Sequence, residues 1–366
     1  MGMRKKWIII FSIKGMRYKR RKDKQGDKMK KKLYKNIAAV LALMLVFLAG
    51  CGSTGKETNV KANGEEYTLK IGYGTVLCMA PLHIAIEKGY FDEEGLNYEV
   101  VKMDGLVTEY VGSGHVDASY GLVSKFIQPI SNGLNITMTS GIHTGCIKLL
   151  VKKDSDIKNL EDLKGKNVGV NGLAEAPCVM LKRALDEVGV GVTPDNLEVN
   201  FVVYANSDLA MALDSGAVDA ICLVDPAATV AANSYGYEVI FDNATHPSYA
   251  NEYCCATFVL SDIVEKYPES AQKYTRAVMK AAAWVDDNPY EAAQFLIEKE
   301  YLSGDPQVFG DILASYEFTP SVQGGYEAVV KNVNEFVQIG LLYANTDVEA
   351  FIEKSFVYLE NVEESY

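Results

Sequence analysis

One six-residue pattern occurs twice in this chain. It reads Ser-Gly-His-Val-Asp-Ala at residues 113–118 and Ser-Gly-Ala-Val-Asp-Ala at residues 215–220. Each copy follows an amphipathic run and precedes a short apolar run, at residues 119–123 and 221–224. Glycine directly after a helix is a common helix-ending residue, so each copy predicts a helix end, a glycine turn and a buried parallel strand. About a hundred residues separate the copies, which favours two α/β lobes with a ligand-binding cleft between them over a solenoid.

The rest of the chain supports an α/β fold followed by a helical tail. The predicted strands and apolar runs alternate with helices as far as residue 261, and the pattern after that point is helical. Strands or strand-like runs are expected at residues 67–73, 98–101, 134–138, 145–152, 167–170, 197–204 and 253–261. Helices are expected at residues 81–88, 108–113, 125–130, 177–188, 208–214, 269–286, 290–300, 306–315, 325–339 and 347–359.

The first 50 residues have the pattern of an export leader. From Met29, four lysines precede an apolar run from Ile37 to Phe47, which is too short for a membrane-spanning helix of about 20 residues. The run ends in Leu-Ala-Gly-Cys51, which resembles the lipobox of bacterial lipoproteins. This resemblance implies that Cys51 carries a lipid and becomes the mature N-terminus. We therefore expect an extracytoplasmic protein, anchored by its lipid to the bacterial cell membrane, whose true start is Met29.

The formal charge of −12 is divided unevenly between the leader and the rest. Residues 1–50 hold 15 of the 36 Lys and Arg residues but 2 of the 48 Asp and Glu residues, so the remainder is strongly acidic. An acidic surface argues against nucleic acid as a partner. Arg183 and Arg276 are the two arginines after the leader, which disfavours a bidentate arginine clamp on a doubly charged anion.

Six cysteines follow Cys51, and their spacing leaves two interpretations open. An even number outside the cytoplasm is compatible with disulfides, but two lobes of this size have cores large enough not to need them. Free thiols are the other interpretation. The six are Cys78, Cys146, Cys178, Cys222, Cys254 and Cys255.

Several short motifs, taken in order, resemble the substrate-binding proteins of ABC importers, in the branch that binds nitrate, taurine, alkanesulfonates or thiamine-precursor pyrimidines. They are Pro81–Ala85 with the Gly-Tyr-Phe and Glu-Gly-Leu that follow, both Ser-Gly-x-Val-Asp-Ala copies, residues 162–169 and Asp225-Pro226. The resemblance implies a periplasmic-binding-protein type II fold, in which two α/β lobes are joined by two hinge crossings. It also implies partners: a small solute, an ABC permease and its ATPase. We expect a leader at 1–50, a tether at 51–66, the first lobe at 67–147, the second lobe at 148–252, and the completion of the first lobe with the C-terminal helices at 253–366.

A second resemblance concerns the segment that begins at Cys254-Cys255. Together with Tyr267-Pro268-Glu269 and Asn288-Pro289 it is similar to the cysteine-rich segment of the eukaryotic thiamine-pyrimidine synthase, which shares the fold. The position that matches the histidine consumed by that enzyme is Lys125, and the cysteine run here is shorter. We therefore expect a monomeric binding protein without a cofactor or catalytic residues, and treat a synthase-like enzyme as an alternative.

Loops at the ends of strands should line the cleft, because ligands of open α/β sheets bind there. The expected ligand-binding residues are Thr75, Cys78, Met79, Gly121, Ser124, Lys125, His143, Thr144, Asn171, Gly172, Ala174, Glu175, Asp225, Tyr253 and Cys254. Residues 141–146 are expected to form an irregular polar segment at the hinge.

Three of these assignments have a structural alternative. Residues 171–176 either offer helix N–H groups to a ligand oxygen or form an ordinary strand–helix turn. Lys125 either neutralises an anion or is a solvated helix lysine. Asp225 either binds a ligand donor or caps the next helix. Because Asp117 and Asp219 hold the same place in both repeat copies, we predict a structural role for them.

The sequence is compatible with two classes of organic or anionic solute and with a metal ion as the ligand. The solute is either a sulfonate- or nitrate-like anion or a heteroaromatic pyrimidine, and the scarcity of arginine favours the pyrimidine or another neutral solute. His143 and Cys146 have the spacing His-x-x-Cys and, with Cys78, Cys178 or Cys254, offer ligands for a soft metal ion. A metal carrier built on His143, Cys146, Cys78 and Cys254 is therefore the alternative to an organic-solute carrier.

Overall fold

The computed structural model describes residues 67–366. The interpretations of the leader, of Cys51 and of the tether concern residues outside this range. Within the described residues, no helix combines the length and the apolar character needed to cross a membrane.

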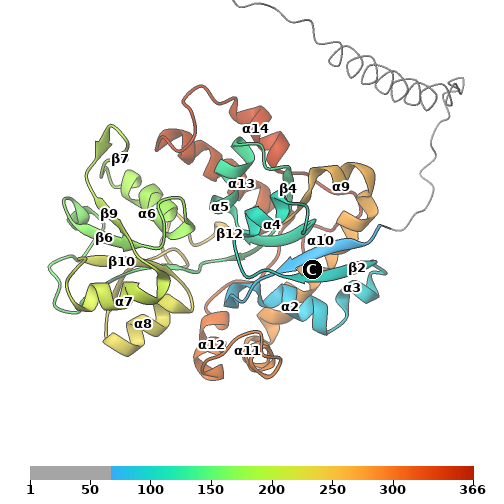
Figure 1. The fold of residues 1–366 in the computed structure, drawn as a ribbon, viewed down its shortest axis with the longest axis horizontal. Helices are drawn as coiled ribbons and strands as arrows, with labels where there is room; N and C mark the ends of the chain where they lie inside the picture. Colours follow the sequence, from blue (N-terminus) through green and yellow to red (C-terminus); the bar gives the residue numbers. More distant parts are fainter. Residues whose placement is uncertain (1–66) are drawn as a thin grey trace, which may run out of the picture. The chain divides into compact units, whose positions relative to one another are not determined.

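The chain forms two separate five-stranded mixed sheets (Figure 1). The first sheet has the order β2-β1-β3-β12-β4, in which β1 is parallel to β2 and β3, and β12 is antiparallel to β3 and β4. Its strands are β1 (Leu69–Tyr73), β2 (Tyr98–Lys102), β3 (Ala118–Leu122), β4 (Ile136–Thr144) and β12 (Tyr253–Leu260). The last of these strands comes from more than a hundred residues further along the chain than β4, so this sheet is completed late in the sequence.

The second sheet is built from the intervening segment. Its order is β11-β5-β10-β6-β9, with β6 parallel to β9 and β10, and β5 antiparallel to β10 and β11. Its strands are β5 (Ile147–Val151), β6 (Asn167–Val170), β9 (Asn200–Val203), β10 (Ala220–Val224) and β11 (Glu238–Asp242), and a small hairpin pairs β7 (Val192–Thr193) with β8 (Asn196–Leu197).

Helices cover both faces of the second sheet, because its strands have apolar residues on both faces. In the second sheet, Leu149 and Cys222 belong to the core that includes α6, whereas Leu150, Ile221 and Leu223 belong to the core formed with α7 and α8. Successive strand residues therefore point to opposite faces, both of which are buried. These helices are α6 (Ala176–Glu187), α7 (Asn206–Asp214) and α8 (Ala227–Tyr235).

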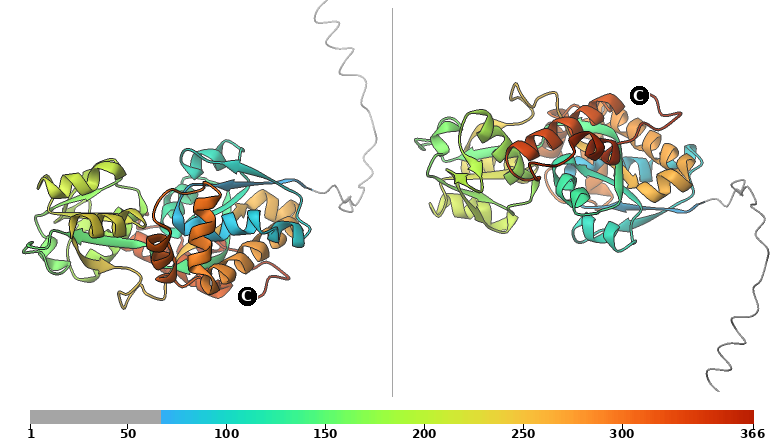
Figure 2. Two further views of the ribbon diagram at one scale, coloured as in Figure 1. Left: turned by 90° about the horizontal axis from the view of Figure 1, so that it is seen from below. Right: turned by 90° about the horizontal axis from the view of Figure 1, so that it is seen from above.

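The remaining helices accompany the first sheet. The C-terminal helices lie with this sheet in both views of Figure 2; α10 packs against α2 and α3, and α13 packs against β4 and α5. The set consists of α2 (Ala80–Glu87), α3 (Tyr90–Glu93), α4 (Val107–Gly112), α5 (Val123–Ser131), α9 (Ser261–Lys266), α10 (Pro268–Asp287), α11 (Pro289–Glu298), α12 (Pro306–Ala314), α13 (Val322–Gln338) and α14 (Val348–Ser355), with short 3-10 turns at Leu77–Met79 and Glu161–Leu163.

The repeated pattern has the predicted structure in both copies. Helix α4 ends before Gly114 and helix α7 ends before Gly216; these glycines have φ values of 73° and 74°, which favour a residue without a Cβ. The strands that follow, β3 and β10, are each parallel to one neighbour. The prediction of a helix end, a glycine turn and a buried strand is confirmed.

The aspartate of each copy fastens its strand to the neighbouring one. Asp117 Oδ2 accepts hydrogen bonds from the backbone N–H of Lys70 at 2.9 Å and from the Tyr67 hydroxyl at 2.8 Å. Asp219 Oδ2 accepts one from the backbone N–H of Asn167 at 2.8 Å. In both sheets the carboxylate thus satisfies a backbone donor at the start of the adjacent strand, which confirms the predicted structural role.

Some of the expected element boundaries are wrong. Residues 141–144 are part of β4, because they pair with β12 on one side and Gly141 exchanges backbone hydrogen bonds with Ser321 on the other. This tertiary pairing overrides the loop-like composition of the segment. The strand expected at 197–204 begins at Asn200, and the helix expected at 347–359 ends at Ser355, since Phe356 bridges to Met138. Strand β11 was not anticipated.

Candidate functional site

The two sheets are joined where β4 runs into β5 and where residues 243–252 lead from β11 to β12. Asn243 ties these crossings together: its Oδ1 accepts a hydrogen bond from the backbone N–H of Ile147 at 2.7 Å, and its amide donates to the carbonyl of Gly145 at 3.3 Å. The backbone N–H of Asp225, at the end of β10, donates to the carbonyl of Cys146 at 2.9 Å. The crossings and a strand end of the second sheet therefore meet at one place.

A narrow cavity lies beside the crossings, between groups that belong to the two sheets. It leaves about 10 Å³, which is room for about one water molecule. A solute of several non-hydrogen atoms would therefore enter only if the two halves separated. The lining residues are Leu122, Ser124, Ile147, Met180, Arg183, Asn243, Tyr249, Glu252, Cys254 and Asn332.

Arg183 is the buried charge of this cavity, and it is fully occupied. It projects from α6 and forms ion pairs with Glu252, at 2.8 Å, and with Glu335 of α13. Its Nη1 donates to Asn332 Oδ1 at 3.2 Å, and Lys331 also pairs with Glu252, at 2.7 Å. Burial by itself lowers the pKa of Arg183, but the two carboxylates raise it overall. Burial likewise raises the pKa of Glu252, but Arg183 and Lys331 bring it below its usual value.

A second ion pair connects the two halves. Lys125, near the start of α5, lies 2.9 Å from Glu175, the residue that precedes α6. Asn171, which directly follows β6, has a buried Oδ1 without a hydrogen-bond partner. Gly172 packs under Glu175, while Ala174 is exposed. The sequence left Lys125 either as a partner for an anionic ligand or as a solvated surface lysine. The structure shows a third arrangement, in which the amine is paired with Glu175.

Asp225 has the structural contacts that the capping alternative describes. Its Oδ1 accepts the backbone N–H of Thr229, in the first turn of α8, at 2.9 Å. Its Oδ2 pairs with Lys148, which also lies 3.8 Å from Asp242. Desolvation raises the pKa of Asp242, with Asp225 and Cys146 adding to the shift.

The other expected residues are spread around this region. Ser124 and Cys254 line the cavity; Met79 is buried in the core and Gly121 packs against Phe126. Thr144 is buried and receives the Nδ1–H of His143 on its carbonyl. Tyr253 does not line the cavity, because its ring is wedged between Gly141 and Gly324 and its hydroxyl donates to the carbonyl of Thr319. Thr75 is exposed and lines an outer hollow of about 640 Å³ with Pro226 and Tyr301.

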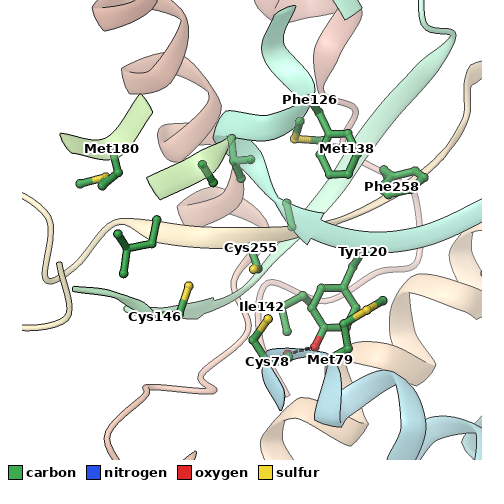
Figure 3. Close-up of a cluster of buried hydrophobic side chains, with 14 of the residues drawn as sticks. Cys78, Met79, Tyr120, Phe126, Met138, Ile142, Cys146, Met180, Cys255 and Phe258 are labelled. Carbon is green, nitrogen blue, oxygen red and sulfur yellow. Dashed lines mark hydrogen bonds between the residues drawn. The ribbon is translucent and has the colours of Figure 1, made fainter. Parts of the chain in front are cut away.

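A cluster of sulfur and imidazole groups lies next to Cys254, which lines the cavity. Figure 3 shows three thiols of this region, those of Cys78, Cys146 and Cys255. Cys78 of the first 3-10 turn, His143 of β4 and Cys255 of β12 each bring a ligand atom within 4.8 Å of the other two. Cys254 Sγ is 3.5 Å from His143 Nδ1, and Cys146 Sγ is 3.4 Å from Cys254 Sγ. Cys178 belongs to the other half and is not part of this cluster.

Mutual contacts shift the acidity of these groups. The contact with Cys255, followed by that with His143, lowers the pKa of Cys78 to about 7. Contacts with Cys254 and Cys255 lower the pKa of Cys146 well below its ordinary value, whereas burial raises the pKa values of Cys254 and Cys255. Burial alone would lower the pKa of His143, but contact with the Cys78 thiol raises it overall.

Sequence reasoning did not select Arg183, Asn332 or Cys255. Arg183 and Asn332 sit on amphipathic helices, and nothing in their local pattern distinguishes them from surface residues. Cys255 was missed because Cys254 was expected to face the cleft, and in a regular strand the next residue faces the opposite side. The register of β12 against β4 shifts on both sides of Cys255, and this irregularity brings both Cys254 and Cys255 to His143.

Comparison with known proteins identifies the family. The family model described as NMT1/THI5 like matches residues 78–292. The chain belongs to this family. The putative binding protein YtlA of Bacillus subtilis is 25% identical over 292 residues, covering 76% of this chain and 82% of that protein. The 4-amino-5-hydroxymethyl-2-methylpyrimidine phosphate synthase of Aspergillus parasiticus is 26% identical over 246 residues, covering 62% of this chain and 68% of the synthase.

A solved structure shows the same fold. The periplasmic nitrate-binding protein NrtA of Synechocystis PCC 6803 superposes with a TM-score of 0.65 at 18% identity, covering 80% of this chain and 86% of that one. The predicted family and the predicted type II periplasmic-binding-protein fold are both confirmed. The relatives therefore include both a putative binding protein and a pyrimidine phosphate synthase.

Proposed function

We propose that this protein is an extracytoplasmic, lipid-anchored binding protein that captures a small neutral organic solute and delivers it to an ABC permease. In this proposal the two sheets are the cores of two lobes, with residues 148–252 forming the second, and the protein has no catalysis of its own. In this proposal the solute is held between the lobes and contacts Ser124, Asn171 and Glu175.

The observation that carries the choice of solute is the pairing of charges around the cleft. Lys125 pairs with Glu175, Lys148 with Asp225, and Arg183 with Glu252 and Glu335. Each of these cations already has a carboxylate partner, so none offers an uncompensated positive charge to a sulfonate or nitrate ion. A neutral heteroaromatic solute avoids that cost, and an amino group on it finds acceptors in Glu175 and in the partnerless Oδ1 of Asn171. A thiamine-precursor-like pyrimidine meets both conditions.

The closed arrangement supports a simple cycle. Lys125–Glu175 and Arg183–Glu335 connect residues on the two sides of the cleft, and the cavity between them has no room for a solute. We infer an open form in which these pairs separate, and a liganded closed form in which the solute bridges the lobes. A ligand shifts such an equilibrium only through contacts that differ between the two forms, so it must touch both lobes.

A synthase-like function is the weaker alternative. The similarity to the Aspergillus enzyme favours it. Against it, the position that resembles the consumed histidine is Lys125, whose amine is tied to Glu175. Turnover of a bound pyrimidine by the purified chain would establish the enzyme alternative.

Exchanging Glu175 for alanine distinguishes the two solute classes because it has opposite effects on them. It removes an acceptor and frees the charge of Lys125. We expect the wild-type chain to bind 4-amino-5-hydroxymethyl-2-methylpyrimidine in calorimetric titration, and Glu175→Ala to weaken this binding by about tenfold, or about 1.4 kcal/mol. Glu349→Ala, an exposed position on α14, is the matched control and should bind as the wild type does. Binding of nitrate or taurine that strengthens in Glu175→Ala would instead assign an anion, and failure of the pyrimidine to bind would refute the proposal.

A further inference from the structure

The buried group of Cys78, His143 and Cys255 has the composition of a soft-metal site. Its members come from three segments that are far apart in sequence: a 3-10 turn, β4 and β12. All three are buried, His143 and Cys255 completely and Cys78 to within 4% exposure. Two thiols and one imidazole, without a carboxylate among them, are a donor set that favours thiophilic ions such as Zn²⁺ over Mg²⁺ or Ca²⁺.

The spacing of the donor atoms is close to what a tetrahedral ion requires. The three atoms lie within 4.8 Å of one another. A zinc ion with bonds of about 2.0–2.3 Å holds its ligand atoms about 3.6–3.8 Å apart, so a contraction of roughly 1 Å at most completes the geometry. Side-chain rotations of this size do not require the strands to move.

A backbone carbonyl orients the ring of His143, as is common for metal-binding histidines. Its Nδ1 lies 2.9 Å from the carbonyl oxygen of Thr144, and since a carbonyl only accepts, Nδ1 carries the proton and Nε2 keeps its lone pair. The ring stacks on Tyr316, with centroids 5.3 Å apart, and lies 4.9 Å from Phe318. These contacts fix the orientation of the imidazole.

Charge balance also fits a divalent ion. Two thiolates and a neutral imidazole around M²⁺ give a net charge of zero, so a filled site avoids the cost of a buried net charge. The neighbouring pair Cys146 and Cys254 places further sulfur beside the site, and Cys254 lines the cavity of the cleft. Further thiols therefore lie close to the three ligands.

We propose that Cys78, His143 and Cys255 bind one thiophilic divalent metal ion in the buried core next to the cavity. The ion joins the 3-10 turn after β1 to β4 and β12, and so connects the first strand of the first sheet to both strands next to the crossings. This site is independent of the solute proposed above, because none of its three ligands lines the cavity.

The test uses the full chain, purified without oxygen, stripped with a chelator and then titrated with Zn²⁺ or with Co²⁺ as a spectroscopic probe. We expect one equivalent of Zn²⁺ to bind, and the Co²⁺ form to show thiolate-to-metal charge-transfer absorption. Cys78→Ser, Cys255→Ser and His143→Gln should each weaken Zn²⁺ binding by about 100-fold or more. Cys178→Ser and Cys222→Ser are matched controls, because both thiols are buried in the other half, and they should bind as the wild type does.

A measurement on the wild type keeps the test decisive if a ligand variant does not fold. Bound Zn²⁺ should protect the thiols of Cys78 and Cys255 from alkylation, and peptide mass spectrometry locates the protected residues. Absence of stoichiometric Zn²⁺ and Co²⁺ binding, protection of other cysteines instead, or a disulfide joining Cys78 to Cys255 in protein isolated without oxygen would each overturn the proposal. Whether the metal-free chain binds a pyrimidine tests only the proposed solute and not the metal site.

Discussion

The replacement Arg183→Met tests the buried ion network that connects the two sides of the cleft. The change keeps an apolar stem of similar reach and removes the guanidinium, which leaves Glu252 without its 2.8 Å partner and Glu335 without its ion pair to α6. The side chain of Arg183 is 1% exposed and that of Glu252 is 10% exposed, so little solvent can replace the lost contacts.

The expected loss of stability follows from these contacts. Removing one member of a buried ion pair generally costs about 3–5 kcal/mol, because the other charge stays buried. Glu252 keeps Lys331 at 2.7 Å and the amide of Asn332 at 2.9 Å, so we expect the lower end, about 3 kcal/mol. Glu335 is the more exposed partner, and Glu335→Gln should cost about 1 kcal/mol.

Urea unfolding followed by circular dichroism measures the effect, with Lys266→Met as the control. Lys266 forms an exposed pair with Asp262 on one helix, and its replacement should leave the unfolding midpoint unchanged. A loss below about 1 kcal/mol for Arg183→Met would refute the claim that this network stabilises the folded protein.

Arg183→Met should also change how the stability of the protein depends on pH. Glu252 has a pKa below its usual value in the folded chain, so its contribution is present at neutral pH and is lost as the pH falls below the ordinary carboxyl range. The wild type should therefore lose more stability on acidification than Arg183→Met does. Equal acid sensitivity of the two proteins would show that the carboxylate does not depend on the arginine.

Two further predictions concern residues in helices that accompany the first sheet. Gly325→Ala should destabilise the protein by about 3 kcal/mol or more, because an added Cβ overlaps the backbone nitrogen of Gly141, whereas Gly112→Ala meets no atom within 4 Å and should be neutral or slightly stabilising in thermal unfolding. Burial of His83 lowers its pKa to about 4. Below about pH 6.5 this histidine is therefore protonated in the unfolded chain but stays neutral in the folded chain, so the free energy of unfolding should fall by about 2 kcal/mol between pH 7 and pH 5. In His83→Phe this contribution to the pH dependence should be absent.

Local sequence signals determined much of the fold. The two glycine turns, the strands after them and the aspartates at their starts were predictable because helix endings, turn conformations and strand periodicity depend on residues that are neighbours in the chain. The family was recognisable for the same reason: its motifs are short segments in a fixed order. The helices from α10 to α14 were also predicted, with boundaries that the structure moved by a few residues, whereas α9 was not.

Tertiary structure decided the site. The polar segment at residues 141–144 is a buried strand because β12 pairs with it, and Cys255 faces His143 because the pairing register shifts beside it. Arg183 meets Glu252 and Glu335 through contacts between residues 69 and 152 positions apart, and Lys125 reaches Glu175 across 50 positions. Such contacts depend on strand register and on how separate elements pack. Periodicity within a segment specifies which face of that segment is buried, but not which distant side chain it meets.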